Sequence, residues 1–346
     1  MRHAEPFTST GVSASDRPEI SRRRRRRLQR GVSAGVTLLA VLVAPRTCEA
    51  AALDDGFHTD QHRLQGPSLQ ATLLPEPAHG LQGARLRASL ADGTRVEITG
   101  FAGDVVHAHL LDASSDQALE PATPLRLHPA ALVGMQWTEA ACERDTCAER
   151  TFRITSAAPD ESENTMPEHR SNRDTWLYRV EHTTAPATMA HDWQGACSDG
   201  PEGDMGLFVD GRWGSDGTWQ GDGHTFSCPA GVIAKCARSW GYKPWKTLAS
   251  GRGPVSLLPL HLACTRAALA DYCGDGIPHT RAGVGIVMAD DHGFNPRGFR
   301  AGDLESMFDQ QGAVRVHDWR VPELAPACRP ERAAAASAAG TIEVWR

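Results

Sequence analysis

Nine cysteines constrain the fold of this 346-residue chain more than any other feature. One of them, Cys48, lies inside an N-terminal export signal and would be lost on cleavage. An even number of cysteines behind such a signal indicates disulfide bonds rather than zinc sites. The eight cysteines predicted to form disulfides are Cys142, Cys147, Cys197, Cys228, Cys236, Cys264, Cys273 and Cys328. Their even number predicts that all of them pair, and it leaves open which pairs form.

The export signal is predicted from the order of three segments at the N-terminus. Arginines at 22–27 precede an apolar stretch at 31–44, and small residues follow around Cys48. Fourteen apolar-biased residues fall short of the roughly 20 that a membrane-spanning helix needs, so a cleaved signal peptide is favoured over a membrane anchor or a nucleic-acid-binding arm. Residues 1–52 are therefore predicted to be a signal peptide, and the mature protein to be secreted or periplasmic.

The net charge of the mature chain restricts the classes of partner that it is expected to bind. Removal of residues 1–50 takes away ten arginines and four acidic residues, which leaves 26 basic and 38 acidic side chains. An acidic protein is a poor partner for nucleic acid or for an anionic membrane surface. No second long apolar run follows, so no transmembrane segment is expected in the mature chain. An envelope glycan or another envelope protein is the expected partner.

Composition and periodicity predict an α+β, β-rich fold of two domains. The first domain should begin with a three-strand meander, because apolar and polar residues alternate at 84–90, 94–99 and 105–111 and Asp92-Gly93 is a hairpin-type turn. The second should carry two short helices and be held by disulfides. In order, the predicted parts are a linker (53–82), a β-rich N-terminal domain (83–157), a polar linker (158–174), a C-terminal domain (175–330) and an Ala-rich tail (331–346).

Two patterns raise the question of a metal site. His107 and His109 lie two apart in a predicted strand and so share a face, but no third ligand follows at motif spacing, and a polar strand face is favoured. Three Asp-Gly pairs stand at 210–211, 216–217 and 222–223, with Arg and Trp where a calcium loop needs ligands. Repeated hairpin turns are favoured there, and no metal or cofactor is predicted.

Two short helices, each with two cysteines, are predicted at 228–241 and 259–272. At a rise of 1.5 Å per residue, cysteines eight or nine residues apart lie some 12–13 Å apart along a helix, too far for a disulfide within it. The helix cysteines (Cys228 and Cys236, Cys264 and Cys273) are therefore expected to bond between the helices or to strands that carry Cys197 and Cys328. A local disulfide between Cys142 and Cys147 is favoured over a pair of zinc ligands.

The same two segments contain a recognisable motif. Its residues are Ala234-Lys235-Cys236, Gly241-Tyr242-Lys243-Pro244-Trp245, Cys264, residues 270–276 and His279-Thr280. In order and spacing they resemble the ADYC domain, a secreted bacterial domain whose name spells Ala270-Asp271-Tyr272-Cys273 in this chain. The resemblance extends over about residues 176–323. It implies an exported compartment and a fold unit, and it implies no reaction.

Cys273, His279 and Asp275 allow an alternative, catalytic interpretation as nucleophile, base and orienting carboxylate. A helix C-terminus carries partial negative charge, which disfavours the thiolate that such a nucleophile requires. A disulfide at Cys273 is therefore favoured, and catalysis is not expected. Hydrolysis of an envelope polymer remains the alternative function, and it would need Asp275, His279, Asp291 and His292 to converge in one cleft.

Lysine usage supplies a binding hypothesis. The chain has three lysines against thirty-three arginines, and all three lie within twelve residues. This favours sites that need a compact ammonium rather than a planar guanidinium, with chance and packing as the alternative. We expect a basic and aromatic surface patch that holds an anionic group or a sugar face, on a non-enzymatic envelope protein. Its residues are Lys235, Lys243, Lys246, Trp240, Tyr242 and Trp245.

Overall fold

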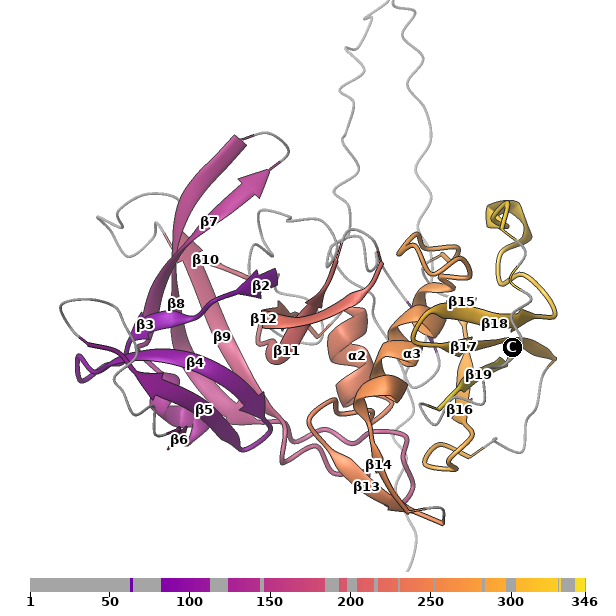
Figure 1. Ribbon diagram of the computed structural model, residues 1–346, viewed down its shortest axis with the longest axis horizontal. Helices are drawn as coiled ribbons and strands as arrows, with labels where there is room; N and C mark the ends of the chain where they lie inside the picture. Colours follow the sequence, from indigo (N-terminus) through magenta and orange to yellow (C-terminus); the bar gives the residue numbers. More distant parts are fainter. Residues whose placement is uncertain are drawn as a thin grey trace, which may run out of the picture. The chain divides into compact units, whose positions relative to one another are not determined.

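The computed structural model describes residues 63–64, 82–112, 124–143, 146–183, 193–197, 204–214, 217–229, 231–251, 253–281, 284–296, 303–328, 330 and 340–345. The predicted signal peptide at 1–52 lies outside these residues, as does nearly all of the predicted linker at 53–82. Two α-helices and several antiparallel sheets make up the described part of the chain (Figure 1). Neither helix has the length and apolarity that a membrane span requires.

The largest sheet has eight strands in the order β10-β9-β8-β7-β3-β4-β5-β6 (Figure 1). Its strands are β3 (Arg87–Ser89), β4 (Arg95–Ala102), β5 (Val105–Leu110), β6 (Leu125–Leu127), β7 (Gln136–Glu143), β8 (Thr146–Pro159), β9 (Trp176–Thr183) and β10 (Gln194–Gly195), and a 3-10 helix, η2 (Pro129–Leu132), precedes β7. The predicted meander is confirmed, because β3, β4 and β5 pair in sequence order. Alternation places Val96 and Ile98 in the core, as a half-buried strand requires.

The remaining elements surround two helices, α2 (Val232–Arg238) and α3 (Leu258–Leu269). α2 packs against α3 and β12, and α3 packs against β17, β18 and β19 (Figure 1). The other strands are β1 (Arg63–Leu64), β2 (Gln82–Ala84), β11 (Leu207–Trp213), β12 (Trp219–Ser227), β13 (Thr247–Ser250), β14 (Gly253–Ser256), β15 (Val284–Gly285), β16 (Val287–Asp290), β17 (Leu304–Asp309), β18 (Gly312–Val316) and β19 (Ile342–Trp345), and a second 3-10 helix is η4 (Pro322–Leu324). They form a three-stranded sheet β11-β12-β2, a four-stranded sheet β16-β19-β17-β18, and the pairs β13-β14 and β1-β15.

Among the described residues, three disulfides link segments in the second half of the chain. They join Cys197 to Cys228, Cys236 to Cys264 and Cys273 to Cys328, with Cα–Cα distances of 5.5, 5.9 and 5.9 Å. The expectation that neither helix closes on itself is confirmed, since Cys236 of α2 bonds to Cys264 of α3 and the other two bonds involve no helical residue. Both helices are shorter than predicted, so that Cys228 follows β12 and Cys273 follows the end of α3.

The predicted local disulfide at Cys142 and Cys147 stays a prediction. The backbone register of β7 and β8 places these two residues opposite each other. Their side chains lie outside the described residues.

The predicted division into two domains is not confirmed, and the segment at 158–174 is not a free linker. β8 ends at Pro159 and pairs with β9, which was expected to open the second domain. Asp160 is buried and bonds to Arg238 of α2 with an N–O distance of 2.6 Å. The polar side chains that indicated a solvated linker instead satisfy one another, as in the 2.9 Å hydrogen bond from Asn164 Nδ2 to Asn172 Oδ1.

The predicted tail at 331–346 is wrong at its end. β19 lies between β16 and β17 in the four-stranded sheet and buries Ile342 and Val344. The alternation of apolar and polar residues in Ile342–Trp345 is the signal of a half-buried strand. The prediction missed this strand because it treated these residues together with the alanine-rich segment before them.

Substitution of Ile342 by alanine tests the structural role of β19. Ile342 is fully buried in an interior strand, so Ile342→Ala should lower the free energy of unfolding by about 2–5 kcal/mol. Thr341→Ala is the matched control and should change it by about 0.5 kcal/mol or less. Urea unfolding measures both, and equal small effects would contradict a core role for this strand.

Candidate functional site

The motif Ala270-Asp271-Tyr272-Cys273 forms the turn that ends α3. Ala270 adopts the left-handed conformation with φ 53° and ψ 41°, and it is the one residue other than glycine with a positive φ in the described part of the chain. Its N–H bonds back to carbonyls of the last helical turn, as at a helix C-cap. The helix therefore ends at Leu269, three residues before the predicted end at 272.

The buried carboxylate of Asp271 organises the segment that follows, residues 271–276, which we call the Asp271 loop. Its Oδ1 accepts hydrogen bonds from the N–H groups of Gly274 and Asp275 at 2.9 and 3.1 Å, and its Oδ2 accepts one from Gly276 at 3.0 Å. Burial raises the pKa of Asp271, while the Arg266 guanidinium and the hydrogen bond from the N–H of Gly276 oppose that rise. The loop is thus closed around one carboxylate.

Arg266 ties the Asp271 loop to two neighbouring hairpins. Its Nη1 donates to Asp271 Oδ2, its Nη2 donates to the carbonyl of Gly217, and its Nε donates to the carbonyl of Gln310 at 3.4 Å. Gly217 lies between β11 and β12, and Gln310 lies between β17 and β18. The guanidinium also lies 4.0 Å from the ring centroid of Trp213. One buried arginine therefore fixes three loops that are distant in sequence.

These three loops and the first turns of α3 line a partly open cavity of about 540 Å³. Trp219 and Gly217 line it from the β11–β12 hairpin, and Gln310 from the β17–β18 turn. Leu258, Pro259 and Leu262 of α3 form its apolar wall. We call it the Arg266 cavity. Its volume lies within the roughly 300–1,000 Å³ that is common for small-molecule sites.

Gly274 closes one side of the cavity and has no room for a side chain. Its φ is +74°, and a Cβ there would overlap the carbonyl oxygen of Gln311. The glycine that follows the ADYC letters is therefore required both by the backbone conformation and by the close approach of the β17–β18 turn.

A second buried arginine caps α3. Arg320 donates to the carbonyls of Ala267 and Ala268 at 2.7 and 2.9 Å and pairs with the buried carboxylate of Glu305 at 2.9 Å. The hydroxyl of Tyr272 accepts a hydrogen bond from the backbone N–H of Arg320 at 2.8 Å. Tyrosine of the motif thus belongs to a structural network at the helix end.

The catalytic interpretation of Cys273 is contradicted, because the sulfur is bonded to Cys328. Asp275 is exposed and accepts a hydrogen bond from the N–H of Ile277, while His279 Nδ1 donates to the carbonyl of Leu324 at 2.6 Å. Within the described residues, no hydrogen bond or ion pair joins these three side chains into a nucleophile, a base and an orienting group.

Asp291 and His292 lie at a different turn, after β16. There Asp290 is the organising carboxylate and accepts hydrogen bonds from the N–H groups of His292, Phe294 and Asn295. Burial raises the pKa of Asp290. His292 Nε2 lies 3.7 Å from Asp291 Oδ1. The four residues required for a hydrolase are thus found at two turns, and no hydrogen bond or ion pair joins the side chains of one turn to those of the other in the described part of the chain.

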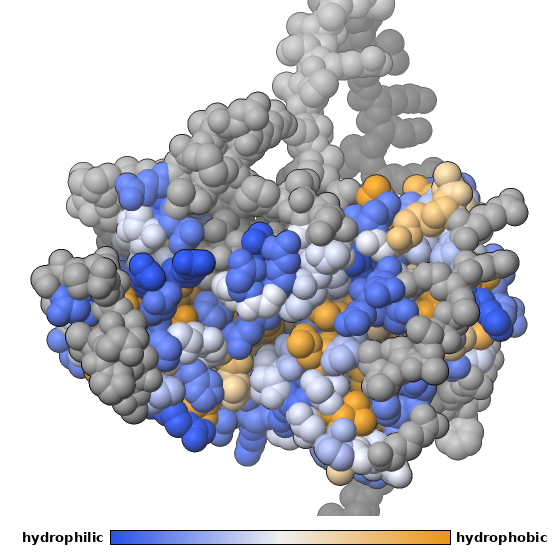
Figure 2. Space-filling model, in the orientation of Figure 1, coloured by the Kyte–Doolittle hydropathy of each residue, from blue (hydrophilic) through white to orange (hydrophobic). Residues whose placement is uncertain are grey.

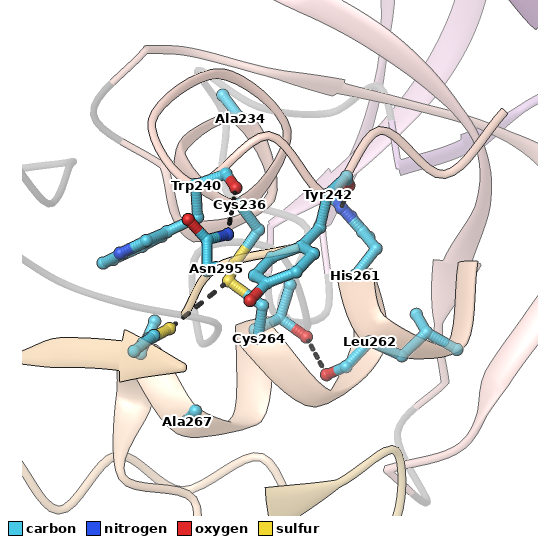
Figure 3. Close-up of a disulfide and its surroundings, with 12 residues drawn as sticks. Ala234, Cys236, Trp240, Tyr242, His261, Leu262, Cys264, Ala267 and Asn295 are labelled. Atoms are coloured by element: carbon cyan, nitrogen blue, oxygen red, sulfur yellow. Dashed lines mark hydrogen bonds between the residues drawn. A yellow bond between two sulfur atoms is a disulfide. The ribbon is translucent and has the colours of Figure 1, made fainter. Parts of the chain in front are cut away.

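The predicted lysine and aromatic surface patch is not formed. The structure buries four of its six side chains, and the exposed fractions of Lys235, Lys243, Trp240 and Tyr242 are 1, 2, 1 and 0%. Figure 3 shows Trp240 and Tyr242 packed around the disulfide that joins Cys236 of α2 to Cys264 of α3. The prediction that Trp240 and Tyr242 lie at the surface is wrong. They follow α2, a short helix in which the residues from Val232 to Ala237 are all buried.

Two of the lysines share one acidic partner, Asp174. Lys243 Nζ lies 2.5 Å from Asp174 Oδ1 and also donates to the carbonyl of Ser171 at 2.9 Å, and Lys246 pairs with the other carboxylate oxygen. Burial lowers the pKa of Lys243, and Asp174 opposes that shift. Packing explains the choice of lysine at 243. Trp245 and Lys246 keep partial exposure, and a binding role for these two stays a prediction.

The structure places four of the residues considered as metal ligands on strands: His107, His109, Asp210 and Asp222. His107 and His109 share the partly buried face of β5, as expected. Asp210-Gly211 forms a bulge in β11 and Asp222-Gly223 lies within β12, so the expectation of three successive turns is wrong. In the described ranges, no group of three or more His, Cys, Asp or Glu side chains is placed to hold a metal ion.

Sequence reasoning missed the residues that build the Arg266 cavity. Arg266 was not singled out because arginine is common in this chain. The signal that could have identified it is its position on the same helix face as Leu262 and Leu269, where a charge is expected to be buried. Trp219 and Gln310 carry no local signal, because they meet only when the β11–β12 and β17–β18 hairpins are brought together.

The fold and the site together define a β-rich, disulfide-bonded domain with two short helices. The family model of the ADYC domain matches residues 129–322, more than half of the chain, and the protein belongs to the ADYC domain family. The match begins at η2, well before the expected start at 176, because β7 and β8 are part of the same sheet as β9. Searches of curated proteins and of solved structures find no match to the chain.

Replacement of Lys243 by arginine tests the packing explanation. The 2%-exposed ammonium fits between Asp174 and the Ser171 carbonyl, so the larger guanidinium of Lys243→Arg should lower the free energy of unfolding by about 1–3 kcal/mol. Lys246→Arg is the matched control, since its side chain is 34% exposed and pairs with the same carboxylate, and it should change stability by about 0.5 kcal/mol or less. Equal effects of the two variants in urea unfolding would contradict a shaped lysine site.

Proposed function

We propose that this protein is a secreted or periplasmic, non-enzymatic binding protein of the cell envelope. The Arg266 cavity carries this proposal. It has the volume of a ligand site, and among the described residues that line it there is no Asp, Glu, His or Cys. A cavity whose described lining has no acid or base to activate a nucleophile such as the Thr218 hydroxyl is suited to holding a molecule rather than to transforming it.

The disulfides support the choice of compartment. Such bonds persist in the periplasm and outside the cell and are rare in the cytosol. Three of them lie among the described residues, and the predicted signal peptide would direct the chain to an oxidising compartment.

The surface supports a localised site rather than a broad apolar interface. Figure 2 shows one face of the molecule, on which hydrophobic residues lie in small groups between hydrophilic ones. Among the described residues, the exposed large hydrophobic side chains stand far apart in the sequence: Leu110 ends β5, Val133 follows η2, and Ile277 lies between α3 and β15. Single exposed apolar side chains are normal and do not mark a docking surface.

The bond between Cys273 and Cys328 disfavours the alternative of a hydrolase. Without the thiol, hydrolysis would depend on Asp275, His279, Asp291 and His292. The His279 ring is already held by a backbone carbonyl, and Asp291 and His292 lie at a different turn. Positioned acid and base groups must reach one reacting atom to contribute to a rate.

Retention on envelope material tests the proposal. Mature protein from the exported fraction of the native host should co-sediment with the insoluble envelope of that host and release no soluble fragments from it. Absence of retention would contradict the binding function. Release of fragments that stops in an Asp275→Asn/His279→Gln variant would contradict the non-enzymatic proposal and favour the hydrolase.

A further inference from the structure

We infer that the Arg266 cavity binds neutral saccharide rings. This inference rests on the proposed binding function and specifies the class of its ligand. The inference depends on three properties of the cavity: its charge, its aromatic wall and its amide groups. Each property restricts the class of ligand further.

The cavity offers no net charge to a ligand. Its one ionisable lining residue is Arg266, whose side chain is 1% exposed. The guanidinium is already paired with Asp271 and donates to two backbone carbonyls. A buried cation that is paired and hydrogen-bonded has little attraction left for an anionic ligand. The expected ligand is therefore neutral.

Trp219 gives the cavity a fixed aromatic wall. Its ring lies edge-to-face on that of Trp213, with a centroid distance of 5.3 Å and an interplanar angle of 78°. Trp213 is itself buried and lies against the Arg266 guanidinium. The face of an aromatic ring is electron-rich and attracts the polarised C–H groups on the face of a pyranose. A ring that is already held by packing loses little entropy when a ligand stacks on it.

The rest of the cavity lining includes amide and apolar groups. Gln310 and Gln311 line it from the exposed β17–β18 turn, and a glutamine side chain both donates and accepts hydrogen bonds, as adjacent sugar hydroxyls require. Leu258 and Leu262 offer apolar surface to the C–H groups of the same rings. A neutral ligand with both hydroxyl-rich edges and C–H faces satisfies the whole lining, and pyranose rings have this character.

Calorimetric titration with defined oligosaccharides tests the inference. The probes are three neutral trisaccharides, namely cellotriose, maltotriose and tri-N-acetylchitotriose, and one charged analogue, trigalacturonate. At least one neutral trisaccharide should bind, with an affinity that is unchanged between low and high salt. Absence of binding by all three, or binding of trigalacturonate more than about 10-fold tighter than each of them, would overturn the inference.

Variants at two positions locate the binding in the cavity. Trp219→Ala should weaken the neutral trisaccharide by about 10-fold, and Trp219→Phe, which keeps an aromatic face, by less. Gln310→Ala changes an exposed turn residue and should weaken it by about 2- to 10-fold, whereas Gln220→Ala, on β12 outside the cavity, should have no effect. Unchanged affinity in folded Trp219→Ala and Gln310→Ala protein would place the sugar elsewhere and overturn the inference.

The outcomes separate this inference from the proposed function. Retention on envelope material without binding of any neutral trisaccharide would contradict the saccharide inference and leave the envelope-binding function standing. Binding of a trisaccharide without retention on the envelope would sink the envelope function and leave the saccharide site standing.

Discussion

The ion pair between Arg266 and Asp271 is the interaction on which the C-terminal half of this protein depends. Both side chains are almost fully buried, with exposed fractions of 1 and 0%. Buried charges are tolerated only when they are paired and when their remaining donors and acceptors are satisfied. Here the carboxylate closes the Asp271 loop, and the guanidinium bonds to the two hairpins that meet it. The Arg266 cavity exists because these three loops are held at fixed distances.

Buried carboxylates that accept several hydrogen bonds also organise two other parts of the chain. Asp290 gathers three backbone N–H groups in the turn after β16 and accepts a hydrogen bond from the hydroxyl of Tyr242 at 3.0 Å. Glu305 and Arg320 perform the corresponding task at the end of α3. Disulfides and satisfied internal charges thus fix the loops around the apolar core that contains both helices. The motif Ala270-Asp271-Tyr272-Cys273 therefore has a structural role. It would affect the proposed ligand indirectly, because it holds the loop whose Gly274 lines the Arg266 cavity.

Local patterns in the sequence predicted the parts of this fold that depend on local physics. Alternation in β3, β4 and β5 predicted the meander, and helix geometry predicted that Cys236 and Cys264 would bond outside their own helices. The failures involve long-range pairing. Polarity at 158–174 indicated a linker, because a sequence does not reveal that Asp160 will meet Arg238. Clustered lysines indicated a surface, because the partner of Lys243 stands 69 residues away. The saccharide site combines Trp219 and Gln310, which no spacing rule connects.

A double-mutant cycle on Arg266 and Asp271 tests the central claim most directly. The variants are Asp271→Asn, Arg266→Met and their combination, and urea unfolding gives the free energy of each. Each single substitution should cost about 3–5 kcal/mol, because it leaves the other charge buried without its partner. The combined variant should cost less than the sum of the two by about 1–3 kcal/mol. Additive costs, within about 0.5 kcal/mol, would show that the two charges are not coupled and would contradict the account.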